Sequence, residues 1–260
     1  MPSSDLHRAT AFRLAFARRQ AAEVREVPGG FLVLDERYAR SYEHNQLHLD
    51  GPVSPAEVSG LAEAAMADLP HRLITVHDDA LGTACAAHLT RAGYEHATEL
   101  VMTHTGPTPP PAPARAESLD LPALAPALAR QQRLWMPDAD DETIRQLVER
   151  RAARLRGAER VEFLGVYATG GDLASWADLY LAPTDGVAQV EDLVTAAPHA
   201  RRGHADTLLA DALHRSAAAG CTLRFLIADA DDWPRHWYAR RGFTVVGRAH
   251  VFTRHRAATP

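Results

Sequence analysis

Short apolar runs alternate with amphipathic segments through the second half of this 260-residue chain. Runs rich in Val, Leu, Phe and Tyr predict strands, and apolar residues at helical spacing predict helices. The predicted strands cover residues 161–168, 173–181, 187–195, 222–228 and 243–253. The predicted helices cover 119–135, which we expect to be broken, 141–156 with Leu155 on its apolar face, 206–219 and 233–241. This order predicts a mixed α/β fold.

The first half repeats this plan. Strands are predicted near 23–27, 31–34 and 44–49, and a helix at 55–67. The strand, helix and strand expected over 72–104 parallel those over 224–253, which indicates a tandem duplication. Residues 105–118 are proline-dense and predict an extended connector. We therefore expect domains at 1–104 and 119–260, joined by the linker 105–118.

The most informative segment runs from residue 189 to residue 205, where a strand leads through a basic turn into a helix. Arg201 and Arg202 precede Gly203, His204 and Ala205 at the predicted helix start. Backbone N–H groups at a helix N-terminus lack intrahelical partners and attract anions. The small residues Gly203 and Ala205 leave the backbone accessible, so the turn is a candidate diphosphate site.

A second segment, Trp237-Tyr238-Ala239-Arg240-Arg241-Gly242-Phe243, follows some thirty residues later. Together the two segments resemble the GNAT N-acetyltransferase superfamily over about residues 115–254. In that family the first segment binds the diphosphate of acetyl-coenzyme A, and the second places a tyrosine near the coenzyme sulfur. Two positions depart from the family pattern: Ala200 replaces Arg or Gln, and Asp231 replaces an asparagine that lies seven residues before the tyrosine.

The resemblance implies two GNAT-like halves, each a mixed, mainly antiparallel twisted sheet flanked by helices. The first half is the degenerate copy. Its corresponding turn carries Pro52 and Pro55, which remove N–H donors, and has no arginine. We expect only the second half to bind acetyl-coenzyme A, with no metal.

Acetyl transfer to an amine needs a neutral nucleophile, donors for the oxyanion and a proton for the departing thiolate. Tyr238 is the candidate proton donor, or else a tyrosine that only packs beside Trp237. The two-residue period of a strand places Gln189 and Glu191 on one face, and Glu191 is the candidate base, although water can take that role. The resemblance also implies that backbone N–H groups of Leu193, Val194 and Thr195 hold the thioester carbonyl and the pantetheine amides.

Other candidate site residues have simpler explanations than catalysis or metal binding. His44 and His48 lie too far apart on a strand to share a metal. The acids Asp229, Asp231 and Asp232 fit a capped turn. Trp135 could line an acceptor site or lie in the core. The face formed by Trp176, Asp178 and Tyr180 is either an acceptor pocket or, more simply, a polar solvent face. Cys85 and Cys221 predict neither a disulfide nor a metal site.

The net charge of −5 argues against a nucleic-acid binder. No apolar run reaches the roughly 20 residues of a membrane span, and no signal peptide is evident, so a cytoplasmic protein is expected. The sequence thus predicts an acetyl-coenzyme A-dependent N-acetyltransferase that acts on the amine of a small molecule or peptide, as a monomer or homodimer. The alternative is a non-catalytic module that binds or senses acyl-coenzyme A.

Overall fold

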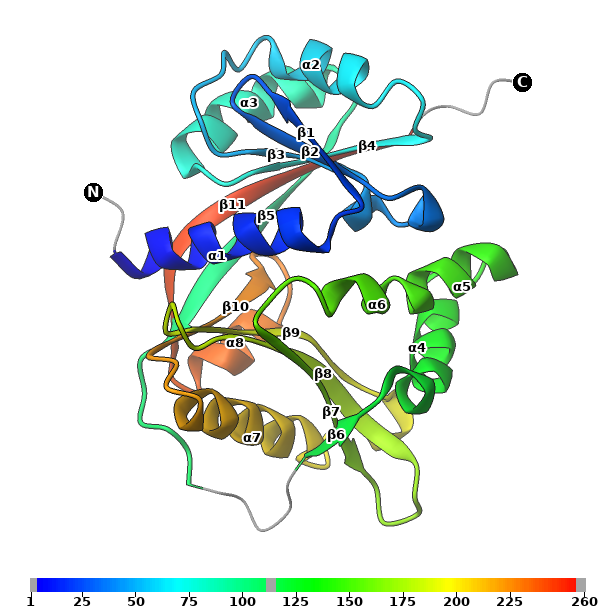
Figure 1. The fold of residues 1–260 in the computed structure, drawn as a ribbon, viewed down its shortest axis with the longest axis vertical. Coiled ribbons are helices and arrows are strands. Elements are labelled where there is room, and N and C mark those ends of the chain that lie inside the picture. Colours follow the sequence, from blue (N-terminus) through cyan, green and yellow to red (C-terminus); the bar gives the residue numbers. More distant parts are fainter. Residues whose placement is uncertain (1–3, 111–115, 256–260) are drawn as a thin grey trace. The chain divides into compact units, whose positions relative to one another are not determined.

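The computed structural model describes residues 4–110 and 116–255 (Figure 1). Its α-helices are α1 (Ser4–Gln20), α2 (Val58–Ala65), α3 (Asp79–Arg91), α4 (Leu121–Trp135), α5 (Asp141–Glu149), α6 (Arg151–Arg154), α7 (His204–Ala218) and α8 (Pro234–Ala239). Its strands are β1 (Glu23–Val27), β2 (Gly30–Leu34), β3 (Gln46–Leu49), β4 (His71–Val76), β5 (Glu95–His104), β6 (Glu117–Leu119), β7 (Arg160–Tyr167), β8 (Leu173–Ala182), β9 (Val187–Thr195), β10 (Leu223–Asp229) and β11 (Phe243–His255). Short 3-10 helices are η1 (Glu36–Tyr38), η2 (Tyr42–His44) and η3 (Ala197–His199).

The chain forms two compact units that interleave along the sequence. The first unit contains residues 1–102, 227–238 and 245–260, and the second contains 103–226 and 239–244. The contiguous boundaries expected from the proline-dense segment are therefore not the boundaries of these units. Part of that segment, 111–115, lies outside the described residues, and Glu117 and Ser118 belong to strand β6.

In the first unit the strand order is β1-β2-β3-β4-β11-β5. β3 and β4 pair in parallel, whereas β1–β2, β2–β3 and β4–β11 pair antiparallel. Alternate residues of β2 face opposite sides: Leu32 joins the core with α2 and α3, while Phe31 and Val33 pack with Ala17 of α1. Helices thus cover both faces of this sheet.

In the second unit the order is β10-β9-β8-β7-β6. Only β9–β10 among these pairs is parallel. Helix α4 packs Leu124 and Leu128 against Phe163 and Trp176, and α7 packs against β7, β8 and β9. Strand β8 is buried along its whole length because helices cover both of its faces. The expected mixed, mainly antiparallel sheet with flanking helices is confirmed.

Strand β11 makes an unexpected connection. Its residues 250–255 pair with 76–71 of β4, in the N-terminal half of the chain. The backbone N–H of Ala230 likewise donates to the carbonyl of Thr98 at 2.8 Å. A simple duplication predicts that each half pairs its own last strands. Instead, β11 from the C-terminal half completes the sheet of the first unit.

Several element predictions were wrong in detail. Helix α4 is continuous through Pro126, because burial of Leu124, Ala127 and Leu128 offsets the loss of one backbone hydrogen bond. The helix expected over 141–156 ends at Glu149 and restarts as α6, which leaves Leu155 49% exposed. His44 lies in η2 rather than in a strand. Helix α1 was not anticipated.

Candidate active site

The basic turn between β9 and α7 has the backbone that the sequence predicted. Gly203 has φ 84° and forms the N-cap of α7, which begins at His204, two residues earlier than expected. The first intrahelical bond runs from Thr207 N to Gly203 O at 3.0 Å, so the N–H groups of residues 204–206 precede it. Gly203 and the preceding Arg201 and Arg202 are exposed.

The glycine is required by conformation and not by crowding. A Cβ atom at Gly203 would meet nothing within 4 Å, yet its positive φ disfavours every L side chain. Arg201 also has a positive φ, 62°. The turn therefore presents exposed guanidinium groups and unsatisfied N–H donors to open space, and this combination suits a diphosphate. Ala200, the departure from the family pattern, is exposed as well.

A pocket of about 440 Å³ begins beside this turn. Asp206, the third residue of α7, lines it together with Leu209, Leu213, Arg240 and Arg241. Arg241 pairs with Asp206 and neutralises its carboxylate next to the candidate anion-binding turn. Arg240 is exposed at the same pocket, so its edge is cationic.

Strand β9 places Gln189 and Glu191 on one face, as predicted. The side-chain amide of Gln189 donates to the Glu191 carboxylate. Glu191 is half-buried, and Gln189 is buried. The hydrogen bond orients the Glu191 carboxyl group, whose role as base stays a prediction.

A β-bulge follows Glu191. Glu191 lies opposite Asp178 and Val194 lies opposite Trp176, so Asp192 and Leu193 together face the single residue Ala177. Asp192 has φ 50°, a left-handed value that Asp adopts more readily than most residues. The parallel pairing of β9 with β10 is recorded only from Val187 to Val190 within the described residues. Beyond that point, residues 193–195 have no registered partner on the β10 side among the described residues, and their role as donors stays a prediction.

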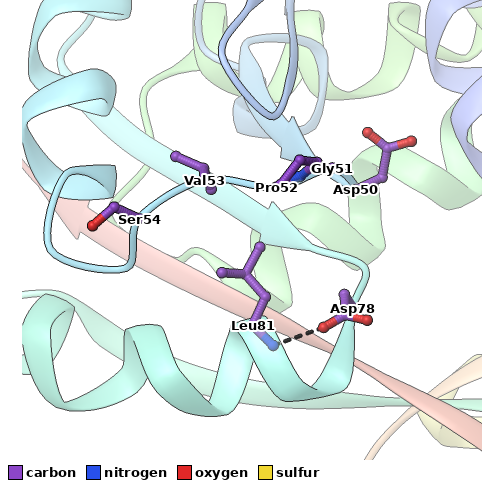
Figure 2. Close-up of a pocket in the computed structure, with 7 residues that line it drawn as sticks. All are labelled: Asp50, Gly51, Pro52, Val53, Ser54, Asp78 and Leu81. Carbon is purple, nitrogen blue, oxygen red and sulfur yellow. Dashed lines mark hydrogen bonds between the residues drawn. The ribbon is translucent and has the colours of Figure 1, made fainter.

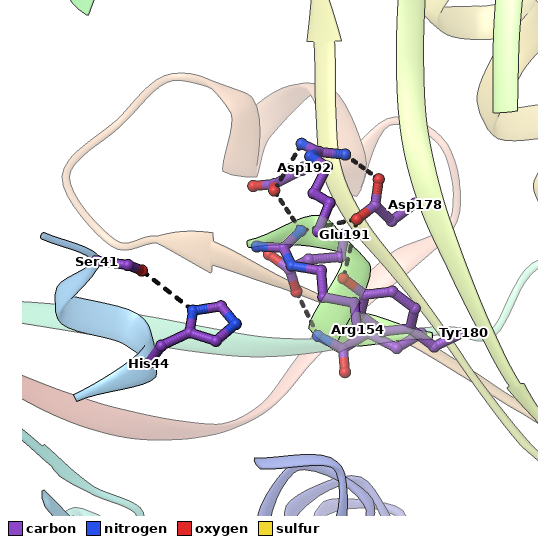
Figure 3. A network of polar contacts seen from close by, with 9 residues as sticks. Ser41, His44, Arg154, Asp178, Tyr180, Glu191 and Asp192 are labelled. Carbon is purple, nitrogen blue, oxygen red and sulfur yellow. Dashed lines mark hydrogen bonds and ion pairs between the residues drawn. The ribbon is translucent and has the colours of Figure 1, made fainter. Parts of the chain in front are cut away.

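Two arginines of α6 reach the bulge. Arg154 donates to Asp178 at 2.7 Å and to Asp192 at 2.6 Å, and Arg151 donates to Asp192 at 2.9 Å and also pairs with Asp178. Figure 3 shows Asp178, Asp192 and Tyr180 gathered about Arg154. The Tyr180 hydroxyl donates to Asp178 at 3.1 Å, and burial raises the pKa of Tyr180 well above its usual value.

This network corrects one expectation. Trp176, Asp178 and Tyr180 are 2%, 0% and 1% exposed, so they form neither a solvent face nor an open acceptor pocket. Sequence reasoning missed Arg151, Arg154 and Asp192. The available signal was a lone aspartate inside an apolar strand, since a buried carboxylate requires cationic partners.

Tyr238 belongs to the first unit, on α8. It is 8% exposed, and its ring meets that of Trp237 edge-on, with the centroids 5.1 Å apart. This packing agrees with both readings of Tyr238, so its role as proton donor stays a prediction. Asp231 is exposed just before α8, and its N–H donates to Asp229 at 2.7 Å, as expected of a capped turn.

The first unit has its own pocket of about 520 Å³, at the turn that the predicted duplication matches to the basic turn of the second half. Its lining includes Asp50, Pro52 and Asp78, and Figure 2 shows Asp78 accepting a hydrogen bond from the N–H of Leu81. Two carboxylates and a proline disfavour a diphosphate here. The pocket is consistent with the prediction that this copy does not bind coenzyme A.

Among the described residues, no three His, Cys, Asp or Glu side chains form a group able to hold a metal ion. His44 contacts Ser41, and His48 contacts His77. Cys85 and Cys221 are free and buried. Trp135 is 59% exposed, so it is not a core aromatic.

Comparison with known proteins agrees with this geometry. Residues 127–243, which contain the basic turn, Glu191 and Tyr238, match the model of the acetyltransferase (GNAT) family. This segment is a GNAT acetyltransferase domain. The predicted family and enzyme class are thereby confirmed, while the tandem origin of the two halves stays a prediction. No curated protein matches the chain.

Solved structures share the fold over nearly the whole chain. A functionally unknown conserved protein from Staphylococcus epidermidis superposes with a TM-score of 0.67 at 10% identity, covering 92% of this chain and 95% of that one. A GCN5-related N-acetyltransferase from Kribbella flavida gives 0.58 at 20% identity, covering 94% and 95%. Another from Sphaerobacter thermophilus gives 0.54 at 18%, covering 87% and 76%. At these identities the likeness is one of fold.

None of the helices within residues 4–110 and 116–255 combines the length and apolar character that a bilayer span requires.

Proposed function

We propose that this protein is an acetyl-coenzyme A-dependent N-acetyltransferase that moves the acetyl group directly to the amine of a small molecule or peptide. The observation that carries this proposal is the exposed turn at 201–205 inside the GNAT domain. There, a left-handed glycine opens α7 beside two arginines. Acetyl-coenzyme A supplies the activated acetyl group, and the residues below bind and orient it.

Binding of the diphosphate falls to the second unit. The N–H groups of Gly203, His204 and Ala205 hold the diphosphate, and Arg201 and Arg202 neutralise its charge. The cationic pocket beside Asp206 leaves room for the part of the ligand that adjoins the diphosphate. Asp231, which takes the place of the family's asparagine, is a further candidate contact of the coenzyme.

The chemistry requires a base, oxyanion donors and an acid. Glu191, oriented by Gln189, takes the proton from the incoming amine, directly or through water. Within residues 193–195, a backbone N–H group that points away from β8 holds the thioester carbonyl. Tyr238 returns a proton to the departing thiolate, a transfer that is feasible because the reference pKa of a phenol, near 10, is close to that of an alkyl thiol. No step requires a metal, and we place the reaction in the cytoplasm, carried out by a monomer or homodimer.

A matched pair of glycines tests whether the turn at 201–205 binds the coenzyme. Gly203 and Gly171 have φ 84° and 85°, and an added Cβ meets nothing within 4 Å at either position. Alanine at each costs about 1–2 kcal/mol of backbone strain. Only Gly203 belongs to the proposed diphosphate site, so Gly203→Ala should weaken coenzyme A binding about tenfold and Gly171→Ala should not.

Calorimetry with coenzyme A measures this difference and should give one site per chain. Thiol release from acetyl-coenzyme A, screened over amine classes, measures the reaction. Equal affinities for the two variants, or two sites per chain, would contradict the proposed site. Coenzyme binding without thiol release from any amine would indicate a binding module.

A further inference from the structure

The β9 bulge decides where one backbone donor points. The N–H of Ala196 donates to the carbonyl of Ala174 at 2.9 Å, while Thr195 lies opposite Ser175. In an antiparallel pair, residues next to a hydrogen-bonded pair turn their N–H groups away from the partner strand. The N–H of Thr195 therefore points away from β8, toward the side where the recorded pairing with β10 ended at Val190.

Without the bulge, the N–H of Thr195 would point toward β8. The register of Glu191 with Asp178, continued without an extra residue, would place Thr195 opposite Ala174. Thr195 would then occupy the position that Ala196 holds, with its N–H donating to Ala174. One extra residue thus converts the Thr195 N–H from a sheet donor into a donor for a ligand.

Side chains hold this bulge from outside the strand. The Asp192 carboxylate, 31% exposed at the left-handed position, accepts from Arg151 and from Arg154. Both guanidinium groups are anchored in turn on Asp178, which is fully buried. The arginine side chains are 6% and 2% exposed, so the clamp is rigid and largely screened from water.

We propose that Arg151 and Arg154 are positioning residues for acyl transfer: they hold Asp192, Asp192 holds the bulge, and the bulge turns the Thr195 N–H toward the thioester carbonyl. The proposal rests on the proposed function, since it needs a thioester at β9. It adds residues of α6 that touch neither coenzyme nor acceptor.

Substitutions at Asp192 separate the clamp from the backbone. Asp192→Gly permits φ 50° but removes the carboxylate, while leaving both arginines paired with Asp178. Asp192→Asn also tolerates φ 50° and keeps an oxygen that accepts from both arginines. Arg145→Met is the matched control, because the ion pairs of Arg145 among the described residues are with exposed Glu142 and Glu149 on α5.

We expect Asp192→Gly to lower kcat about tenfold or more, up to the roughly hundred- to thousandfold scale of losing one oriented oxyanion donor, with the Kd for coenzyme A within about threefold of wild type. Asp192→Asn should recover most of the kcat, and Arg145→Met should match wild type. Wild-type kcat in Asp192→Gly, or equal losses in the Gly and Asn variants, would overturn the proposal and leave the proposed function standing.

A second measurement needs no turnover. Amide hydrogen exchange by NMR should show Ala196 protected and Thr195 exchanging in wild type, with the two reversed in Asp192→Gly. An unchanged exchange pattern in that variant overturns the clamp, whatever the activity. If wild type releases no thiol from any amine, the proposed function fails, while the exchange pattern still decides whether the clamp holds the bulge.

Discussion

Buried histidines of the first unit make its stability depend on pH. Burial lowers the pKa of His48 to about 3 and that of His71 to about 4. Nearby Arg13 and Arg18 add to the shift of His48, while Glu43 opposes it. At His71, Arg72 and His255 lower the pKa, and the hydrogen bond to the Asn45 carbonyl, at 2.9 Å, opposes them. Both rings are therefore neutral in the folded protein at pH 5.

The direction in which stability changes with pH depends on whether the folded or the unfolded protein binds the proton more readily. An unfolded histidine has a pKa near 6.5 and takes up a proton as the pH falls below that value, whereas the folded rings do not until about pH 4 or 3. Acid therefore favours the unfolded state. The stability that neutral histidines permit is fully present above pH 6.5 and falls as the pH drops toward the folded pKa values.

The magnitude is large beside an ordinary stability. At pH 5, about 1.5 units below the unfolded pKa, each of the two histidines costs about 2 kcal/mol of unfolding free energy, at about 1.4 kcal/mol per unit. Together they cost about 4 kcal/mol, against a typical total of about 5–15 kcal/mol. His77, whose pKa burial lowers well below its usual value, adds to the loss.

Urea unfolding followed by circular dichroism at pH 7, 6 and 5 measures the loss. In the wild type the rings of Tyr42 and His71 stack with centroids 3.7 Å apart, and His71→Phe puts another aromatic ring at that position while it removes one titrating group. Its loss between pH 7 and pH 5 should be about 2 kcal/mol smaller than that of wild type. Tyr42→Phe disturbs the same stack without removing a histidine and should keep the wild-type dependence. A pH-independent wild type, or a His71→Phe variant with the full loss, would refute this reasoning.

Three further predictions concern the reaction and the fold. Glu191→Gln should lower turnover mainly below the pH optimum and less above it, where free amine needs no base; an unchanged pH–rate profile would leave Glu191 a structural residue. Tyr238→Phe should lower turnover by roughly ten- to a thousandfold while coenzyme affinity and Tm change little; a wild-type rate in a chemistry-limited assay would remove Tyr238 as proton donor. A fragment of residues 119–260 should not fold stably, since β11 loses its β4 partner; a cooperative thermal transition in the fragment would contradict this.

Much of the candidate site was predictable because its signals are local. A glycine with small neighbours and arginines before an amphipathic helix predicts an anion-binding turn, and the structure gives Gly203 the φ of 84° that this turn needs. The period of two along β9 predicted that Gln189 and Glu191 share a face, and their hydrogen bond agrees.

The bulge at Asp192 and its clamp were not predictable in this way. Periodicity within β9 says nothing of an extra residue, which appears only in the register against β8. From the sequence, Arg151 and Arg154 are expected to be polar residues near the end of an amphipathic helix. They are buried because α6 breaks from α5 and turns them toward Asp178, a residue of a strand covered on both faces.

By itself, the sequence determined most of the strands and helices, the family motifs and the conformation of the candidate anion-binding turn, because each depends on side-chain periodicity and backbone preferences over a few neighbouring residues. Only the tertiary structure decided which strands pair and which polar groups are buried. The pairing of β11 with β4 joins residues far apart in the chain. The contacts of buried Asp178 with Arg151 and Arg154 do the same. Such contacts depend on long-range packing and desolvation, which no local pattern records.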